Sequence, residues 1–340
     1  MNQITKLGGV RLSNFELLRL LCMLMVLNLH SFSGYRHGDG FLQALDFLRE
    51  STSICAVDTF VLISGFFGIK WRKKGLFNLL FQVLFYSFAV YGVCVATGIL
   101  QFDKGEFLHC FKAFYDSWGF ITWYLILYFV SPLLNAFSDN SSEKQLLEYI
   151  VVFYVAQIII MRSVLGGPIN FLLVYLIGRW ISKVGTKRLS DKAVMGYFIT
   201  TSIIFACAYM TYRIMHYDAG GMATFLFGYS YASPFVILQA IFLFLIFSRF
   251  NIQSNIINWL AASCLSIFLI HMHPAIKEVG YYNYTESLYE RPFVDHVLIL
   301  TVLIIAVFFG SILIDKVRIL ISDRLYNLFF RKLLECRQER

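Results

Sequence analysis

The chain has 340 residues, and its 60 aromatic side chains (35 Phe, 20 Tyr and 5 Trp) outnumber its 50 charged ones (29 Lys and Arg, 21 Asp and Glu). Charged residues make up 15% of the sequence, whereas they make up about a quarter of an ordinary soluble domain. With 58% hydrophobic residues and a net charge of +8, this composition excludes a disordered chain, a collagen-like chain and an ordinary soluble enzyme.

Three long segments carry no Asp, Glu, Lys or Arg. They are residues 75–102, 219–248 and 250–276, which are 28, 30 and 27 residues long. A helix that crosses a membrane needs about 20 mostly apolar residues. The strands of an outer-membrane barrel are shorter and alternate apolar with polar residues. These lengths therefore predict an all-α membrane protein, a polytopic bundle of transmembrane helices.

We place about ten membrane spans along the chain. In chain order they cover residues 15–34, 52–69, 76–99, 119–138, 146–162, 168–184, 194–214, 230–248, 256–273 and 294–314. We expect the first span to be retained rather than cleaved as a signal peptide, since it carries Arg19 and His30. The stretch near 105–116 is predicted to be a surface or re-entrant helix. The whole chain, 1–340, is predicted to be one transmembrane domain with a short basic tail at 315–340.

The Lys and Arg side chains predict the orientation. If the N-terminus is cytoplasmic, 19 of the 29 fall in cytoplasmic segments and 8 in outer segments, and the other two lie within spans. Cytoplasmic loops of membrane proteins are enriched in these residues, so both termini are predicted to be cytoplasmic. The same distribution accounts for the positive net charge without nucleic-acid binding, which needs a basic face on a folded soluble domain.

Neither the cysteines nor the histidines form a metal-binding pattern. The seven cysteines contain no Cys-x-x-Cys pair, and most lie in apolar runs, where a thiol serves as a small hydrophobic group. His271 and His273 are two residues apart and do not share a helix face, and no third ligand is nearby in sequence. We expect no metal site, and we predict that His271 lines an outer cavity.

Ionisable side chains inside a bilayer are costly and are therefore candidates for function. Arg19 and His30 lie eleven residues apart in the first span. At 100° and 1.5 Å per residue, eleven steps place both on the same side of a helix, about 16 Å apart along its axis. Two other interpretations stay open: Arg19 could anchor at the interface with Glu16, and His30 could be a core histidine with satisfied hydrogen bonds.

Asp58 lies in the second span, at a depth similar to that of His30. A buried carboxylate beside a histidine would fix the histidine tautomer and stabilise the imidazolium. Contact between the two side chains is a hypothesis, because the sequence indicates depth and not distance.

Basic residues gather at the cytoplasmic ends of several spans. Arg179 shares this side with Arg19, Arg72 and Lys73. Arginine side chains match phosphate groups, so these four residues are candidates for binding a phosphate-bearing donor from the cytoplasm. The alternative is ordinary positive-inside anchoring.

The aromatic pair Trp123 and Tyr124 lies at the outer end of the fourth span. Aromatic side chains are enriched where membranes meet water, so one interpretation is an interfacial belt. The other is a wall that faces a sugar or an acyl group. Together with His271, these two residues are the candidates for substrate binding.

Four segments of the chain form a recognisable series of motifs. They are NFELLRL at 14–20 followed by His30, VDTFVLISGFF at 57–67, WYL at 123–125 with SPLL at 131–134, and SIFLIH at 266–271. Together they resemble the acyltransferase-3 family of bacterial integral membrane acyltransferases. An Arg followed by a His in the first helix is the family's main motif. The segments occur in the family's order and are spread over most of the chain.

The resemblance implies about ten helices and an acyl-CoA donor, usually acetyl-CoA, taken from the cytoplasm; no permanently bound cofactor is expected. It implies transfer of the acyl group to a hydroxyl of a cell-surface polysaccharide or its lipid-linked precursor, in the cytoplasmic membrane of a bacterium. It also implies His30 as the catalytic base and Arg19 as its partner or a donor contact, to which we add Asp58. Acceptor recognition is expected in the outer loops around 35–50, 100–118 and 274–293.

Two features depart from the family. Phe268 replaces the usual Tyr of the last motif, and KWRKK at 70–74 replaces the usual Arg-x-x-Arg.

The alternative function is a glycan or lipid transporter, in which Arg19, His30 and Asp58 would line a pathway. Transporters usually have repeated halves, and no repeat is visible in this sequence. A catalytic base would not tolerate His30→Gln, whereas a residue that lines a pathway often does.

Overall fold

The structure, a computed structural model, describes residues 6–7, 10–31, 40–114, 118–160, 166–215 and 229–338. Apart from a small antiparallel ribbon of β1 (Lys6–Leu7) and β2 (Val10–Arg11), this part of the chain is helical, as predicted. The helices are α1 (Ser13–His30), α2 (Phe41–Ser53), α3 (Ala56–Phe67), α4 (Lys73–Ala96), α5 (Lys104–His109), η1 (Cys110–Lys112), α6 (Gly119–Asn140), α7 (Glu143–Ile160), α8 (Gly166–Val184), η3 (Thr186–Arg188), α9 (Ala193–Met215), α11 (Pro234–Ser248), α12 (Asn255–Ala261), α13 (Cys264–His271), α14 (Pro274–Ile276), η4 (Lys277–Tyr282), α15 (Asn283–Ser287), η5 (Leu288–Glu290) and α16 (Phe293–Gln338).

Among the described residues, five helical segments are long and apolar enough to cross a membrane. They are Phe41–Phe67, Lys73–Ala96, Gly119–Asn140, Ala193–Arg213 and Phe293–Ser322, and two shorter apolar helices are Pro234–Ser248 and Asn255–His271. Every predicted span overlaps a described helix, and the short helix predicted near 105–116 is present as α5 and η1. The number of ten crossings and the cytoplasmic position of both termini stay predictions.

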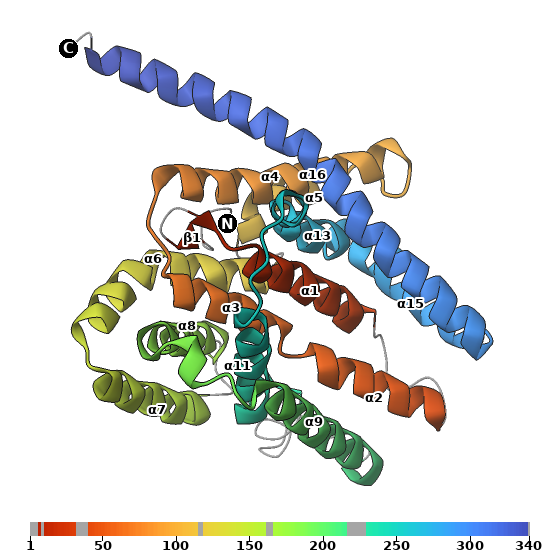
Figure 1. Ribbon diagram of the computed structural model, residues 1–340. Coiled ribbons are helices and arrows are strands. Elements are labelled where there is room, and N and C mark those ends of the chain that lie inside the picture. The colour runs from red at the N-terminus through yellow and green to blue at the C-terminus, as the bar shows by residue number, and fades with distance from the viewer. Residues whose placement is uncertain are drawn as a thin grey trace.

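α1 runs through the middle of the bundle and packs against both α3 and α13 (Figure 1). Most of its residues are buried, including the polar side chains of Asn14, Glu16 and Arg19. The start of the helix is tied to α11, because Asn14 Nδ2 donates to the carbonyl oxygen of Phe247 at 2.9 Å. A helix that is covered on all sides presents its polar groups to the interior of the protein rather than to lipid.

α3 and α8 approach each other closely enough that two positions require glycine. A Cβ atom at Gly65 would collide with the carbonyl of Tyr175, and one at Gly178 would lie 2.5 Å from the carbonyl oxygen of Leu62. Glycine has no Cβ and allows this backbone approach. The contact holds α3, which carries Asp58, firmly against α8.

The predicted span 52–69 begins too late. The helical segment starts at Phe41 and runs to Phe67 with a turn at residues 54–55, so residues 41–50 are not the outer loop expected for acceptor recognition. Asp46 and Arg49 lie within this helix, and their side chains pair at 3.3 Å, one turn apart on α2. Opposite charges that pair within a helix reduce the cost of placing either of them in a bundle.

α16 continues through the predicted tail at 315–340. It extends over 46 residues to Gln338 and projects beyond the rest of the bundle in Figure 1. The last span was expected to end at residue 314, just before Asp315 and Arg318. These side chains are 0% and 6% exposed and pair with each other, with Arg318 Nε 2.5 Å from Asp315 Oδ1. Asp315 also accepts from the hydroxyl of Tyr86 on α4 at 2.8 Å, so this part of α16 is packed against the bundle.

Candidate active site

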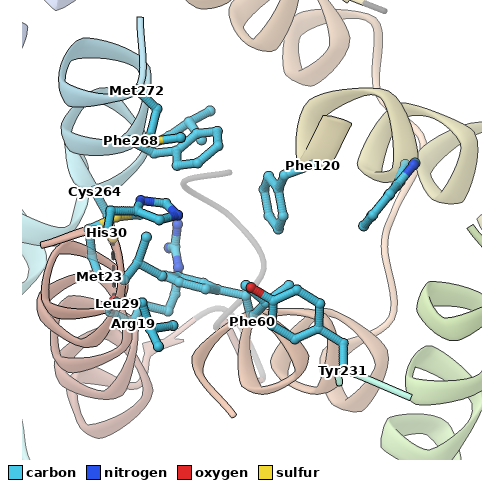
Figure 2. A pocket seen from close by; sticks show the side chains of 14 residues that line it. Arg19, Met23, Leu29, His30, Phe60, Phe120, Tyr231, Cys264, Phe268 and Met272 are labelled. Atoms are coloured by element: carbon cyan, nitrogen blue, oxygen red, sulfur yellow. Dashed lines mark hydrogen bonds between the residues drawn. The ribbon is translucent and has the colours of Figure 1, made fainter. Parts of the chain in front are cut away.

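A cavity of about 190 Å³ lies inside the bundle, with walls from α1, α3, α6 and α13 (Figure 2). Its lining is mostly aliphatic and aromatic, and it includes the side chains of Met23, Phe60, Phe120, Phe268 and Met272. The groups with polar atoms in the lining are Arg19, His30, Trp123, Tyr231 and Cys264. An apolar pocket with a few converging polar groups is the usual form of a small-molecule site.

Arg19 and His30 line this same cavity, so the shared helix side predicted from their spacing is confirmed. Arg19 is not an exposed interfacial anchor. Its guanidinium Nη1 lies 2.9 Å from Glu16 Oε2, and the two side chains are only 3% and 0% exposed. Glu16 neutralises the charge of Arg19 in a place where an isolated charge would be very costly. The cavity therefore holds a guanidinium that is paired on one side and faces the pocket on the other.

His30 pairs with His271, which lies 241 residues further along the chain. His30 Nδ1 is 2.8 Å from His271 Nε2, so the contact joins the end of α1 to the end of α13. His271 is 2% exposed and is not part of the cavity lining, so it lies behind His30 instead of facing the pocket itself. Its other ring nitrogen, Nδ1, is 2.5 Å from the carbonyl oxygen of Ile267. His30 is therefore a cavity residue with a buried polar partner.

Asp58 is not the partner of His30. The two side chains are not hydrogen-bonded in the part of the chain that the structure describes. Asp58 Oδ1 accepts from Asn170 Nδ2 at 2.9 Å, and Asn170 Oδ1 accepts from Gln157 Nε2 at 2.9 Å. The carboxylate thus points from α3 toward α8. The hypothesised contact was wrong because similar depth in two helices does not fix the direction in which each side chain points.

The predicted aromatic pair is divided between two environments. Trp123 lines the cavity, whereas Tyr124 is buried next to Ser64 on α3 and is not part of the lining. Trp123 is therefore a wall residue rather than a member of an exposed belt, and its indole N–H is a candidate donor to a bound substrate.

Gly167 makes room for the indole of Trp123, because an added Cβ would collide with the ring. Gly167→Ala is therefore expected to displace Trp123 and to lower the free energy of unfolding by about 1–3 kcal/mol, the usual cost of overpacking. Thermal unfolding in detergent measures the loss of stability, and the KM for the donor measures the displacement of Trp123. Gly92→Ala on α4 is the matched control, since nothing lies within 4 Å of a Cβ built there. Equal unfolding curves and KM values for the two variants would contradict the prediction.

The basic residues predicted to bind a donor do not all meet at the cavity. Arg179 pairs with Asp139 at 2.5 Å near Gly68, and Arg72 and Lys73 are exposed just beyond α3. Hydrogen bonds hold this segment: the hydroxyl of Tyr175 accepts from the backbone N–H of Ile69 at 2.9 Å, and that of Tyr128 accepts from the N–H of Arg72 at 3.1 Å. Arg179, Arg72 and Lys73 thus lie at one end of the bundle, and Arg19 lies inside it.

Several lining residues were missed by sequence reasoning. Cys264, Phe268 and Met272 recur every four residues and place one face of α13 on the cavity. This four-residue spacing, which ends at the residue directly after His271, was the signal in the sequence that could have identified these lining residues. Phe120 and Tyr231 carried no signal of their own. Within the described ranges, no group of three His, Cys, Asp or Glu side chains is placed to hold a metal ion.

A comparison with known protein families identifies one domain over most of the chain. The acyltransferase domain of the acyltransferase-3 family matches residues 12–316, which includes α1, the cavity and α13. Because the match covers most of the chain, the protein belongs to this family. Neither a curated protein nor a solved structure matches the chain. Membership supports acyltransferase activity in general, and the apolar helices agree with a membrane protein.

Proposed function

We propose that the protein transfers an acyl group, normally acetyl, from acyl-CoA to a hydroxyl of a cell-surface polysaccharide or its lipid-linked precursor. The observation that carries this proposal is the placement of Arg19 and His30 on one buried, mainly apolar cavity. Such a cavity excludes water, which would otherwise compete with the acceptor hydroxyl for the thioester.

His30 acts as the general base. It removes the proton from the acceptor hydroxyl while the oxygen attacks the thioester carbonyl. The tetrahedral intermediate then collapses, the carbon–sulfur bond breaks, and the proton on His30 passes to the departing CoA sulfur. The products are the ester and CoA with its free thiol. Arg19, the Trp123 N–H and the Tyr231 hydroxyl line the same cavity and are the candidates for stabilising the oxyanion.

The donor enters from the cytoplasm of a bacterium in whose cytoplasmic membrane the protein resides. Acetyl-CoA is a substrate here and not a resident cofactor. Its phosphates bind near Arg179, Arg72 and Lys73, at the end of the bundle where these side chains gather. The thioester reaches the cavity along α1, past Arg19, and the acceptor hydroxyl meets it beside His30.

The test is an NMR count of O-acetyl groups on purified cell-surface polysaccharide. The strains are the wild type, a deletion, and the deletion carrying His30→Ala at equal membrane abundance. We expect the acetyl signal to disappear in both mutants while the polymer remains. Unchanged acetylation with polymer missing from the surface would replace the enzyme with a transporter. If neither changes, this polysaccharide is not the acceptor.

A further inference from the structure

We infer that His271 is a positioning residue that determines which ring nitrogen of His30 takes the acceptor proton. The inference rests on the proposed function, because it concerns the base of that reaction. It differs from the sequence-based expectation, in which His271 lined the cavity and touched the substrate.

The two contacts of His271 fix its tautomer. A carbonyl oxygen can only accept a hydrogen bond, so the 2.5 Å contact with Ile267 requires the proton of His271 to be on Nδ1. In a neutral ring the other nitrogen, Nε2, then carries a lone pair and acts as an acceptor. Nε2 is the atom that faces His30.

The tautomer of His30 follows from that of His271. At 2.8 Å from an acceptor nitrogen, His30 Nδ1 must be the donor and must carry the proton of the ring. His30 Nε2 is then unprotonated, which is the state that a general base requires. Because Nδ1 is occupied by His271 behind the cavity wall, Nε2 is the nitrogen that remains for a hydroxyl in the cavity.

The reverse arrangement would need protons on both nitrogens of His271. That ring would carry a positive charge at 2% exposure, where burial strongly disfavours the charged form. When both rings are neutral, His271 donates to the Ile267 carbonyl and His30 donates to His271. Both contacts are then satisfied without a buried charge.

Aromatic neighbours hold the rings in this orientation. The centroid of the Tyr281 ring lies 5.3 Å from that of His271, and the centroid of Phe268 lies 6.2 Å from that of His30. The hydroxyl of Tyr281 donates to the carbonyl oxygen of Leu27 at 2.9 Å, three residues before His30. Two contacts therefore join α1 to the segment around His271: the one between the imidazoles and the hydrogen bond from Tyr281 to Leu27. Together they fix the distance between the two imidazoles.

His273, two residues further on, shows what a purely structural histidine looks like in this segment. Its Nδ1 accepts from the backbone N–H of Ala275 at 3.1 Å, and its Nε2 donates to the carbonyl oxygen of Ser87 at 3.1 Å. It is buried, does not line the cavity and has no nitrogen left for His30. It therefore provides a matched control for substitutions at His271.

The experiment compares His271→Asn with His271→Gln in membrane vesicles. Glutamine reaches the position of Nε2 and can accept from His30 Nδ1, whereas asparagine ends near the position of Nδ1 and cannot. The vesicles receive acetyl-CoA and surface polysaccharide from a deletion strain as acceptor, and His273→Gln and His30→Ala are run in parallel. We expect His271→Asn to lower kcat by about 100-fold, at the lower end of the loss of a general base, with KM for acetyl-CoA unchanged. We expect His271→Gln to recover most of the wild-type kcat, and His273→Gln to retain it per folded molecule.

The outcomes separate the inference from the proposed function. If His30→Ala is inactive but His271→Asn keeps the wild-type kcat, the inference fails and the proposed function stands. If glutamine and asparagine are equally impaired although both variants fold, acceptance from His30 is not the role of His271. If His30→Ala transfers acetyl normally, the proposed function itself fails.

Discussion

Replacing His30 with glutamine is expected to lower kcat for acetyl transfer by about 10²–10⁴-fold, the usual contribution of a general base. Glutamine is similar in length to histidine and keeps a polar group on the cavity, but its amide does not accept a proton from a hydroxyl. The initial rate of label transfer from radioactive acetyl-CoA to polysaccharide, in vesicles of equal protein content, measures the loss.

The same variant separates the enzyme from the transporter. A side chain that lines a pathway needs polarity, which glutamine retains, whereas a base needs a titratable nitrogen. A wild-type transfer rate in His30→Gln would remove His30 from the chemistry. Binding of acetyl-CoA to this variant, measured separately, checks that the cavity remains open, since a collapsed pocket would weaken binding as well as slow the reaction.

Replacing Asp315 with alanine is expected to lower the free energy of unfolding by about 3–5 kcal/mol, because Arg318 would keep a buried charge without its carboxylate. Arg318 is bound to Asp315 through Nε at 2.5 Å and Nη2 at 3.1 Å, and Tyr86 and Gln82 of α4 also donate to this carboxylate. Four donors therefore lose one acceptor group. Unfolding of the purified protein in detergent, monitored through its helix content, measures the difference in the free energy of unfolding between the wild type and the variant.

Glu148→Ala is the control for this effect. It removes one side of the exposed pair Lys144–Glu148, whose side chains are 88% and 62% exposed at a separation of 4.0 Å. Exposed pairs contribute at most about 1 kcal/mol, so a small change is expected.

The double variant Asp315→Leu with Arg318→Leu is expected to regain stability relative to Asp315→Ala, since no unpaired charge remains. An Asp315→Ala protein as stable as the Glu148→Ala protein would contradict the buried ion pair.

Long uncharged runs made most helices predictable from the sequence. Residues 76–99 and 119–138 coincide closely with α4 and α6, because apolar runs of this length have few alternatives to a buried or membrane-spanning helix. The ends of helices were harder to predict wherever opposite charges pair within one turn. Asp46 with Arg49, and Asp315 with Arg318, look like loop residues when each charge is counted alone, but each pair lies inside a helix.

The relative position of two site residues was predictable when both lie in one helix. The period of the α-helix placed Arg19 and His30 on one side of α1, and the structure agrees. The partner of His30 depends on how α1, α3 and α13 are rotated against one another, which periodicity does not specify. Depth alone therefore suggested Asp58, whereas the packing brings His271 to His30 and turns Asp58 toward Asn170.

The wide separation of His30 and His271 in the chain also has a consequence for biosynthesis. At 5–20 residues per second, a ribosome needs roughly 12–48 s to add the 241 residues that follow His30 up to and including His271. During this interval the nascent protein already carries Arg19 and His30 in its first helix but has no α13 to complete the pair. The His30–His271 pair is completed late, when α13 docks on α1, so an N-terminal fragment that stops before α13 would hold the first-helix motif without the partner of His30.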